Sequence, residues 1–489
     1  MNNNIILHLN RDINTPLYIQ LYNELKVLIE NESIQKGEKL PSIRSLAKKL
    51  DVNNVTIVSA YKLLEQEGYV YSKKGSGTYV KENTEDLHFG YFEDENMELM
   101  TNGILSMSED SINFASVSPT PELFPVEDFK NVLIEALDRD KGNAFVYPEI
   151  NGYAPLRKSI SHFLYENYSI DVSSSQIQII SGGQQGIDLI AKTLIQPGDY
   201  VLLENPTYSG AVAAFKSRGA NIISIPMEED GINLEELKKN IKTYHPKFLY
   251  AMPCYQSPTT YSYSDEKKLE IIDLAYENNL YIIEDDFLSD LSYGDNRLPL
   301  KSIDKYDQVI YIKSFSKILM PGLRIGFLTA PKKLLKDIVK AKHTTDITSS
   351  GFIQRAFDLY LRKGYWKDHI QKIKLDYSEK YILLLSQIKK LKSHGISFIE
   401  PSGGLSLWLK LPKDIDSIEL YNECMKNNVI VVPGKIFFID EKSEYTNYIR
   451  LSFGSVTKEQ IAKGIDIIDS SILNLKGEKN EDTKYIPLV

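Results

Sequence analysis

The chain has 489 residues, too many for one ordinary hydrophobic core, so two or three domains are expected. Hydrophobic residues make up 42% and charged residues 25%, which is typical of globular proteins in water, and no apolar run is long enough to cross a membrane. The two cysteines, Cys254 and Cys424, are far apart in the sequence, which argues against a disulfide framework. The seven histidines lack the spacing of zinc ligands, which argues against a zinc site.

The net charge of −9 is unevenly distributed along the chain. Residues 1–81 hold eleven Lys and Arg against eight Asp and Glu, net +3, whereas the remainder holds 46 against 58, net −12. This asymmetry suggests separate tasks for the two parts. The first residues, MNNNIILHLNRD, lack the basic start and long apolar stretch of a signal peptide, so we expect a cytoplasmic protein.

Residues 1–81 are expected to form a compact unit. A helix is predicted to open at Pro41 and Ser42, because serine caps helices well and apolar residues then recur at helical spacing up to Leu50. The turn DVNN follows, and a second helix ends near Gly68. The segment YVYSKKGSGTYV alternates, turns at Gly75–Gly77 and alternates again, as a hairpin does.

Two helices joined by a tight turn and followed by a hairpin form a winged helix-turn-helix, whose second helix enters the major groove of DNA. Arg44 and Lys74 are candidates for phosphate contacts, and Asn54 and Thr56, at the start of the second helix, are candidates for base contacts. The alternative is a helical interaction module whose basic residues are only solvated.

The stretches PLYIQLYNELK, LPSIRSLAKKLDV and GYVYSKKGSGTYV resemble the DNA-binding domain of the GntR family. The resemblance implies binding to a double-stranded DNA operator and DNA-contacting roles for Arg44, Asn54, Thr56, Lys74 and Gly75. GntR-type domains usually carry an arginine where this chain has Asn54. The operator sequence therefore does not follow from the resemblance.

Residues 82–112 hold nine acidic residues and no Lys or Arg, with poor apolar periodicity. We interpret them as an acidic, extended linker, the alternative being a solvated loop with a short helix inside. The large domain is expected from residue 113 to residue 475. The final segment, 476–489, is expected to be a disordered tail.

Past residue 170, strand-like runs alternate with amphipathic helices, which predicts an α/β fold with a mainly parallel sheet of about seven strands. The predicted strands are Ile177–Ile180, Tyr200–Leu203, Ile222–Ile225, Phe248–Met252, Leu280–Ile283, Val309–Ile312 and Ile325–Thr329. Ligands of such sheets lie beyond the carboxyl ends of the strands. The polar motifs SGGQQG, ENPTYSG, PCYQSP, EDDF and KSFSK each follow a strand, so we expect them to meet at one edge.

One part of this edge is suited to an anion. The segment Ser181-Gly182-Gly183-Gln184 opens a helix, where free N–H groups and the helix dipole favour negative charge. Ser314 and Arg324 are candidates for further donors to the same anion. Each of these features alone is often purely structural.

The rest of the edge is suited to an aldehyde on a protonated ring. Asp285 and Asp286, at a strand end, can hold a protonated ring nitrogen, and Tyr208 offers a flat face. A lysine among apolar residues, such as Lys317, can lose its proton and form a Schiff base with an aldehyde. Phosphate, pyridinium, aromatic stacking and aldehyde together describe pyridoxal 5′-phosphate.

Asp285, Lys317 and Arg324 are spaced 32 and then 7 residues apart, which resembles the fold-type I, class I aminotransferases. The likeness runs from about residue 113 to about residue 470 and includes YPEINGYAPLRKSI and YIRLSFG. It implies that Lys317 binds the cofactor aldehyde, that Asp285 pairs with the pyridine nitrogen and that Tyr208 stacks on the ring.

The same resemblance assigns the remaining contacts. The phosphate would be held by Gly183, Gln184, Ser314 and Arg324, and Tyr147 would reach the phosphate of the other subunit in a head-to-tail homodimer. Arg450 would bind the α-carboxylate of an amino-acid ligand as a two-pronged clamp.

Two features of the aminotransferase pattern are changed in this chain. Ser257 occupies the position of the usual Asn in Asn-Pro-x-Gly, and Phe287 and Leu288 stand where related sequences place a tyrosine. Both usual donors to the phenolic oxygen of the cofactor are thus missing, although Ser257 stays a candidate cofactor contact. Related transcriptional regulators that respond to γ-aminobutyrate carry an arginine where this chain has Gly210.

A GntR-like domain, a linker and an aminotransferase-like domain, in that order, resemble the MocR subfamily of transcriptional regulators. The resemblance implies a regulator that senses pyridoxal phosphate, a small amine or amino acid, or both, with little turnover. A second hypothesis is a working aminotransferase with an appended DNA-binding domain. A third is a domain that only dimerises and whose cofactor site is inactive.

Overall fold

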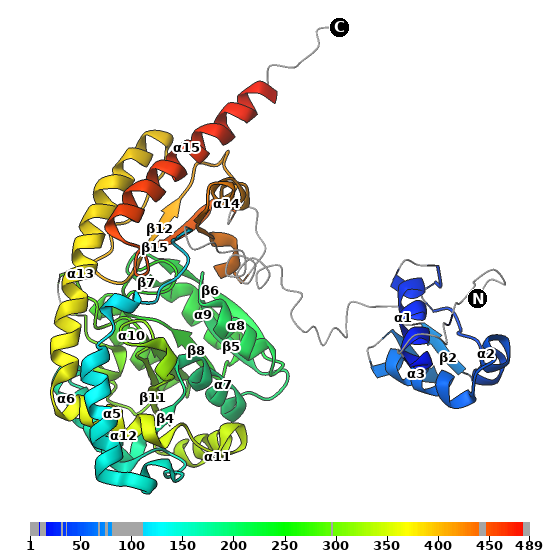
Figure 1. The fold of residues 1–489 in the computed structure, drawn as a ribbon, viewed down its shortest axis with the longest axis horizontal. Coiled ribbons are helices and arrows are strands. Elements are labelled where there is room, and N and C mark those ends of the chain that lie inside the picture. Colours follow the sequence, from blue (N-terminus) through cyan, green and yellow to red (C-terminus); the bar gives the residue numbers. More distant parts are fainter. Residues whose placement is uncertain are drawn as a thin grey trace. The chain divides into compact units, whose positions relative to one another are not determined.

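The computed structural model describes residue 9 and residues 16–30, 33–35, 37–66, 69–73, 77–80, 111–294, 297–439 and 446–482. The chain divides into two compact units, residues 1–105 and 106–489 (Figure 1). Most of the expected linker lies outside the described residues, as do Lys74 and Gly75.

The N-terminal unit is a winged helix-turn-helix, as predicted. Its elements are α1 (Leu17–Glu30), α2 (Ile43–Leu50), α3 (Asn54–Gln66), β1 (Val70–Lys73) and β2 (Gly77–Val80). The Ser42 side chain accepts a hydrogen bond from the Ser45 N–H and so caps α2, and Asp51 ends α2 in the left-handed conformation. Strands β1 and β2 pair antiparallel as the wing. Leu25, Ile57 and other apolar residues of the three helices form one buried core.

The large unit is built on a sheet of eight strands in the order β4-β11-β10-β9-β8-β5-β6-β7. The strands are β4 (Ile177–Ile180), β5 (Tyr200–Asn205), β6 (Asn221–Glu228), β7 (Gly231–Ile232), β8 (Phe248–Ala251), β9 (Tyr281–Asp286), β10 (Val309–Ser314) and β11 (Gly326–Thr329). The five inner strands from β10 to β6 run parallel, whereas β11 and β7 are antiparallel to their neighbours. The α/β fold with a mainly parallel sheet is confirmed. Within this sheet, the two-residue β7 is the strand that was not predicted from the sequence.

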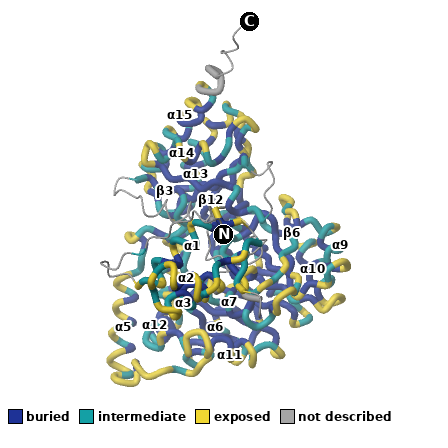
Figure 2. Tube along the Cα trace, turned by 90° about the vertical axis from the view of Figure 1, so that its right-hand side faces the viewer, coloured by how far each residue is buried: buried dark blue, intermediate teal, exposed yellow. Residues whose placement is uncertain are grey.

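Helices cover both faces of this sheet. One face packs against α7 (Gly183–Leu194), α8 (Ser209–Lys216) and α11 (Leu335–Asp346), and the other packs against α9 (Leu234–Tyr244) and α10 (Asp265–Glu277). Neighbouring strand residues alternate between the two cores, so that Ile283 joins the first and Ile282 the second. The inner strands β8, β9 and β10 are buried along almost their whole length, whereas β6 is only partly buried. Figure 2 shows exposed residues along α5 (Val126–Asp140).

The rest of the large unit surrounds a small second sheet. Strands β12 (Ser406–Lys410), β15 (Tyr448–Ser452) and β14 (Val432–Pro433) form it, while β3 (Ile112–Asn113) pairs with β13 (Val429–Ile430). The remaining helices are α6 (Ala154–Tyr168), α12 (Gly351–Arg362), α13 (Tyr365–Ile388), α14 (Ser417–Lys426) and α15 (Lys458–Asp482). Helices α13 and α15 lie side by side (Figure 1).

Short 3-10 helices complete the described part of this unit, namely η2 (Pro121–Leu123), η3 (Lys141–Phe145), η4 (Ser174–Gln176), η5 (Leu300–Ile303), η6 (Pro321–Leu323), η7 (Lys389–His394) and η8 (Gly434–Phe437). Helix α15 continues to Asp482, so the segment expected to be a tail from residue 476 begins inside a helix. Its Lys and Glu residues are good helix formers, and the next proline is Pro487. Among the described residues, no helix has the length and apolarity needed to cross a membrane.

Candidate functional site

Three polar motifs meet at the carboxyl ends of β4, β9 and β10. An ideal Cβ on Gly183, the first residue of α7, would lie 3.5 Å from the Ser314 Cβ and 3.9 Å from the Asp285 Oδ1. Gly326 of β11 pairs with both Ser314 and Ile180, which aligns the ends of β10 and β4. The predicted convergence of Gly183, Ser314 and Asp285 is therefore present.

The start of α7 forms an anion cradle together with Arg324. Gly182, the N-cap residue, has φ 104°, and a Cβ there would lie 2.8 Å from the Arg324 Nη2. Arg324 donates a 2.6 Å hydrogen bond to the Ser181 carbonyl. The first N–H groups of a helix have no partner within the helix, so the cradle concentrates donors and positive charge.

Gln184 links this cradle to Tyr208, the N-cap residue of α8. The Tyr208 hydroxyl donates to the Gln184 Oε1 at 3.0 Å, and the Gln184 Nε2 donates to the Gly210 carbonyl at 3.0 Å. A Cβ on Gly210 would lie 2.5 Å from the Tyr208 hydroxyl, so glycine lets the tyrosine ring lie close over α8. Burial, and secondarily Asp285, raise the pKa of Tyr208.

The two neighbouring aspartates of β9 have different surroundings. Tyr250 of β8 donates a 2.6 Å hydrogen bond to Asp285, and burial raises the pKa of Asp285 to about 6. Asp286 accepts hydrogen bonds from Tyr311, Ser289 and the Lys313 Nζ, the last at 3.0 Å. Of the two carboxylates named by the sequence, Asp285 is the one available to a ligand.

Lys317 lies in the connection from β10 to β11, half-buried. Burial, Arg450 and Arg324, in that order, lower the pKa of Lys317 to about 8. The neighbouring Ile318 carbonyl accepts a 2.6 Å hydrogen bond from the Nε2 of buried His369 on α13. The lysine is thus held on a braced turn and brought close to neutrality near physiological pH.

Arg450 projects from β15, beside Trp408 of β12. Its Nη2 donates to the Ala115 carbonyl at 2.8 Å, while its buried Nε has no hydrogen-bond partner. Burial lowers the pKa of Arg450 to about 10. A buried, half-satisfied guanidinium near Lys317 is suited to an anionic group of a ligand.

The structure does not bring every candidate into this cluster. Tyr147 is 76% exposed, next to the exposed Phe145 and Val146. Ser257 is half-buried beside a cis Ser257–Pro258 bond. Phe287 is partly buried and packs against the sheet core, so no polar group replaces the usual tyrosine there.

In the N-terminal unit, the described candidates lie on the two helices of the helix-turn-helix. Arg44 is exposed near the start of α2. Asn54 is the exposed first residue of α3, and Thr56, two residues later, is half-buried. Arg44 and Asn54 are therefore accessible to a ligand of this unit.

Sequence reasoning missed Tyr250 and His369, which contact Asp285 and the lysine turn through bonds between distant segments. In the sequence, the only sign of this role for Tyr250 is its place on β8, the strand next to β9, near the end that carries Asp285.

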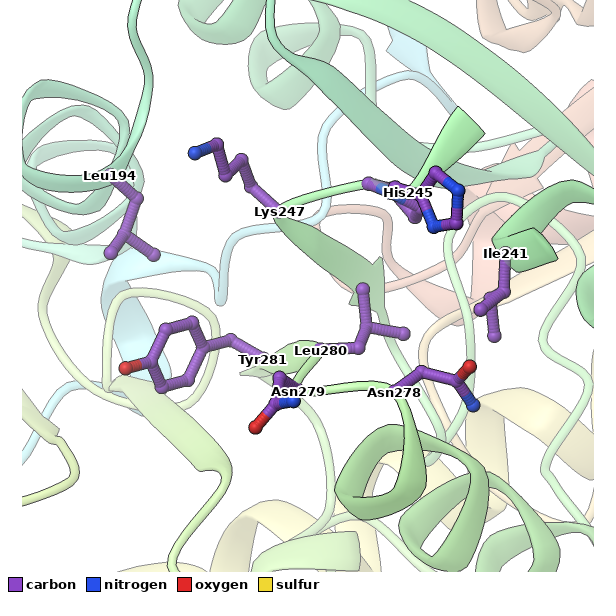
Figure 3. Close-up of a pocket in the computed structure, with 9 residues that line it drawn as sticks. Leu194, Ile241, His245, Lys247, Asn278, Asn279, Leu280 and Tyr281 are labelled. Atoms are coloured by element: carbon purple, nitrogen blue, oxygen red, sulfur yellow. The ribbon is translucent and has the colours of Figure 1, made fainter. Parts of the chain in front are cut away.

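A cavity of about 250 Å³ lies elsewhere, at the amino ends of β8 and β9 (Figure 3). Its polar lining is His245, Lys247, Asn278 and Asn279, and it contains none of the candidates.

The clustered residues fit pyridoxal phosphate. The cradle of α7 and Arg324 fits a phosphate, the buried Asp285 fits a protonated ring nitrogen, and Lys317 fits an aldehyde. The unpartnered Nε of Arg450 leaves a donor for a ligand carboxylate. Within the described residues, no group of His, Cys, Asp and Glu is arranged to hold a metal ion.

Comparison with known proteins agrees with this geometry. Residues 111–468 match the family "Aminotransferase class I and II", and residues 17–80 match "Bacterial regulatory proteins, gntR family". An uncharacterized HTH-type transcriptional regulator of Bacillus subtilis, YdfD, is 31% identical over 92% of this chain and 95% of its own length. Aromatic-amino-acid aminotransferase 1 of Thermococcus litoralis is 31% identical over 75% of this chain and 88% of its own.

Among solved structures, α-aminoadipate aminotransferase LysN of Thermus thermophilus, complexed with N-(5′-phosphopyridoxyl)-L-leucine, matches with a TM-score of 0.71. The two chains are 30% identical, and the match covers 78% of this chain and 97% of LysN. The large unit thus has the fold-type I aminotransferase architecture.

Proposed function

We propose that this chain, which belongs to the class I and II aminotransferase family and carries a gntR-family domain before it, is a transcriptional regulator that senses an amino compound with the help of pyridoxal phosphate. The observation that carries the proposal is Lys317, whose pKa is lowered to about 8. It follows β10 at the sheet edge that holds Asp285, and it lies near Arg450 of the second sheet, in a chain with a winged helix-turn-helix. The proposed domains are residues 1–81 and 113–475, joined by the linker 82–112.

In this proposal, the large unit holds the cofactor through residues of the sheet edge. The phosphate contacts are Gly183, Gln184, Ser314 and Arg324, and Tyr208 lies on the ring. When bound, the cofactor supplies an aldehyde for amines and a ring that withdraws electrons. Asp285 keeps the ring nitrogen protonated, Lys317 delivers a neutral amine, and Arg450 orients a carboxylate.

The proposed partners are an operator DNA, an amine or amino-acid effector and a second copy of the chain. Arg44, Asn54, Thr56, Lys74 and Gly75 are the proposed DNA contacts. Tyr147 supports the head-to-tail dimer, because its exposed ring is available to the phosphate site of another subunit.

A working aminotransferase is the second candidate, because Lys317, Asp285, Arg324 and Arg450 are all retained. The apolar Phe287 and the serine at position 257 favour the regulator, since neither residue supplies the donor found in the enzymes.

The experiment is the visible absorption spectrum of the purified protein beside Lys317→Ala, before and after adding amino acids. A band that depends on Lys317 and shifts with amines without bleaching supports a sensor. Rapid bleaching with consumption of a keto acid supports the enzyme. No band after cofactor addition would contradict the proposed cofactor.

A further inference from the structure

A fully buried lysine, Lys342 of α11, lies behind the anion cradle. Its side chain is 0% exposed, and its ammonium donates three hydrogen bonds of 2.8 Å each, to the Gln185 Oε1, the Asp346 Oδ2 and the Ser349 Oγ. A lysine ammonium has three donors, so this one is fully satisfied. Burying a charged group without such partners is strongly unfavourable, so the three acceptors stabilise the buried ammonium of Lys342.

Two of these acceptors connect Lys342 to the turn that opens α7. The Gln185 Oε1 also accepts a 2.8 Å bond from the Ser181 N–H, and the Ser349 Oγ lies 2.8 Å from the Ser181 Oγ. The Ser181 carbonyl in turn accepts from Arg324. Lys342 is therefore connected to Ser181 by hydrogen bonds through two different residues, Gln185 and Ser349.

The segment that carries Ser349 is held by a strained turn. Ile347 has φ 65° and ψ −63°, and the Thr348 N–H donates to the Asp346 carbonyl at 2.7 Å, which defines a γ-turn of the rare kind. A β-branched residue in this region is a backbone outlier that the surrounding structure must stabilise. The bonds from Lys342 to Asp346 and Ser349, on either side of the turn, provide that stabilisation.

We propose that Lys342 is a positioning residue that fixes the turn Ser181–Gln185 in the geometry needed to bind the phosphate group of a pyridoxal cofactor. The inference rests on the proposed function, because that function supplies the ligand. Lys342 does not touch the ligand; it acts through Gln185 and Ser349. Its loss should weaken phosphate binding selectively, because its contacts lead to the cradle and not to Lys317 or Asp285.

The test titrates the cofactor-free full-length protein with pyridoxal phosphate and, separately, with pyridoxal, which lacks the phosphate, following the absorption band that depends on Lys317. Lys342→Met keeps an unbranched side chain, shorter only by its last atom, and removes the donors. We expect the Kd for pyridoxal phosphate to rise about tenfold or more and the Kd for pyridoxal to change less than about twofold. Ser349→Ala, which breaks only one route, should show a smaller selective loss.

The matched control is Lys268→Met. Lys268 is 2% exposed, donates to the Leu298 carbonyl and lies 3.6 Å from Asp265, so this variant also removes a buried ammonium. Lys268 lies on α10, which covers the face of the sheet opposite to α7. This variant should not change the ratio of the two Kd values. Equal weakening of both compounds in Lys342→Met and Ser349→Ala, or no weakening of either, would overturn the inference. A wild-type protein that binds neither compound would overturn the proposed function, and the inference with it.

Discussion

Burial moves the pKa values of the two key side chains at the site toward neutrality from opposite sides. It raises the pKa of Asp285 to about 6 and lowers that of Lys317 to about 8. A carboxylate that ionises near 6 and an amine that loses its proton near 8 are both usable close to physiological pH. Two neighbouring residues modify these pKa values: Arg450 lowers that of Lys317 further, and Tyr250 opposes the rise at Asp285.

Arg450→Met should make Lys317 a poorer nucleophile at neutral pH. Because Arg450 is the largest charged contributor to the low pKa of Lys317, its removal should raise that pKa from about 8 toward the ordinary value of 10.5. The rate at which added pyridoxal phosphate becomes attached should be measured over a range of pH. In both proteins this rate should increase with pH, and the midpoint of the increase should lie at higher pH in Arg450→Met than in the wild type. Arg362→Met is the control, since Arg362 is 54% exposed and pairs with Asp358. An unshifted midpoint in Arg450→Met would contradict the assignment.

Tyr250→Phe should raise the lowest pH at which the protein still binds the cofactor tightly. The Tyr250 hydroxyl favours the ionised form of Asp285, so its loss should raise the pKa of Asp285 above about 6. Since the ionised form pairs with a protonated ring, affinity falls as pH drops through this pKa. The acid limb of a plot of Kd against pH should therefore move up by about one unit. A limb that moves down, or stays, would show that Tyr250 does not act on Asp285.

At the scale of the elements, strand alternation decides which side chain serves the site. Asp285 and Ser314 face α7, whereas Asp286 and Lys313 face the opposite side of the sheet. The strand pattern alone does not separate the two aspartates, because β9 is buried on both faces and Ile282 and Ile283 are equally apolar; only the aminotransferase resemblance singled out Asp285. The helix-turn-helix was predictable because α2 and α3 have one apolar side, a serine cap and a short turn.

Lys342 of α11 is another residue whose position the local sequence pattern does not predict. Lys342 and Asp346 are four residues apart, a spacing that is usually an exposed pair on a helix surface. Lys342 is instead buried, because α11 packs on the sheet and on the turn that opens α7. Contacts between distant segments, which local pattern does not encode, account for this residue and for Tyr250.

Lys313→Met should destabilise the large unit, because Lys313 joins three elements in a buried ion cluster. Its Nζ lies 3.0 Å from the Asp286 Oδ2 and 2.7 Å from the Asp290 Oδ2, and it lies over the Tyr168 ring of α6. Removing the lysine leaves two buried carboxylates without a cation. We expect the free energy of unfolding, measured in denaturant, to fall by about 3–5 kcal/mol.

The control for the ion cluster is Lys305→Met, which breaks a pair with Asp273 that is about half exposed on both sides. Surface pairs of this kind contribute about 0–1 kcal/mol, so this variant should unfold almost as the wild type does. A loss of similar size in both variants would show that the buried cluster contributes no more than an exposed pair.

For the whole molecule, the proposed homodimer carries two DNA-binding units, and we expect both to bind one operator. Phosphate contacts release counterions, so log affinity falls with log salt by about 0.9 for each phosphate neutralised. Arg44 is exposed on α2 and is a proposed phosphate contact, whereas Thr56 is a proposed base contact. The salt dependence of the two variants therefore reports how many units bind.

Arg44→Ala should reduce the salt slope by about 1.8 if both units of a dimer bind the operator and by about 0.9 if only one does, because each bound unit then loses one phosphate contact. Thr56→Ala should leave the slope unchanged and cost about 1–3 kcal/mol of affinity for the operator relative to random DNA. Fluorescence anisotropy of labelled operator over a salt series measures both quantities. A slope change near 0.9 would mean that one unit carries the DNA contact, and the expectation that both units of the dimer bind one operator would have to be abandoned.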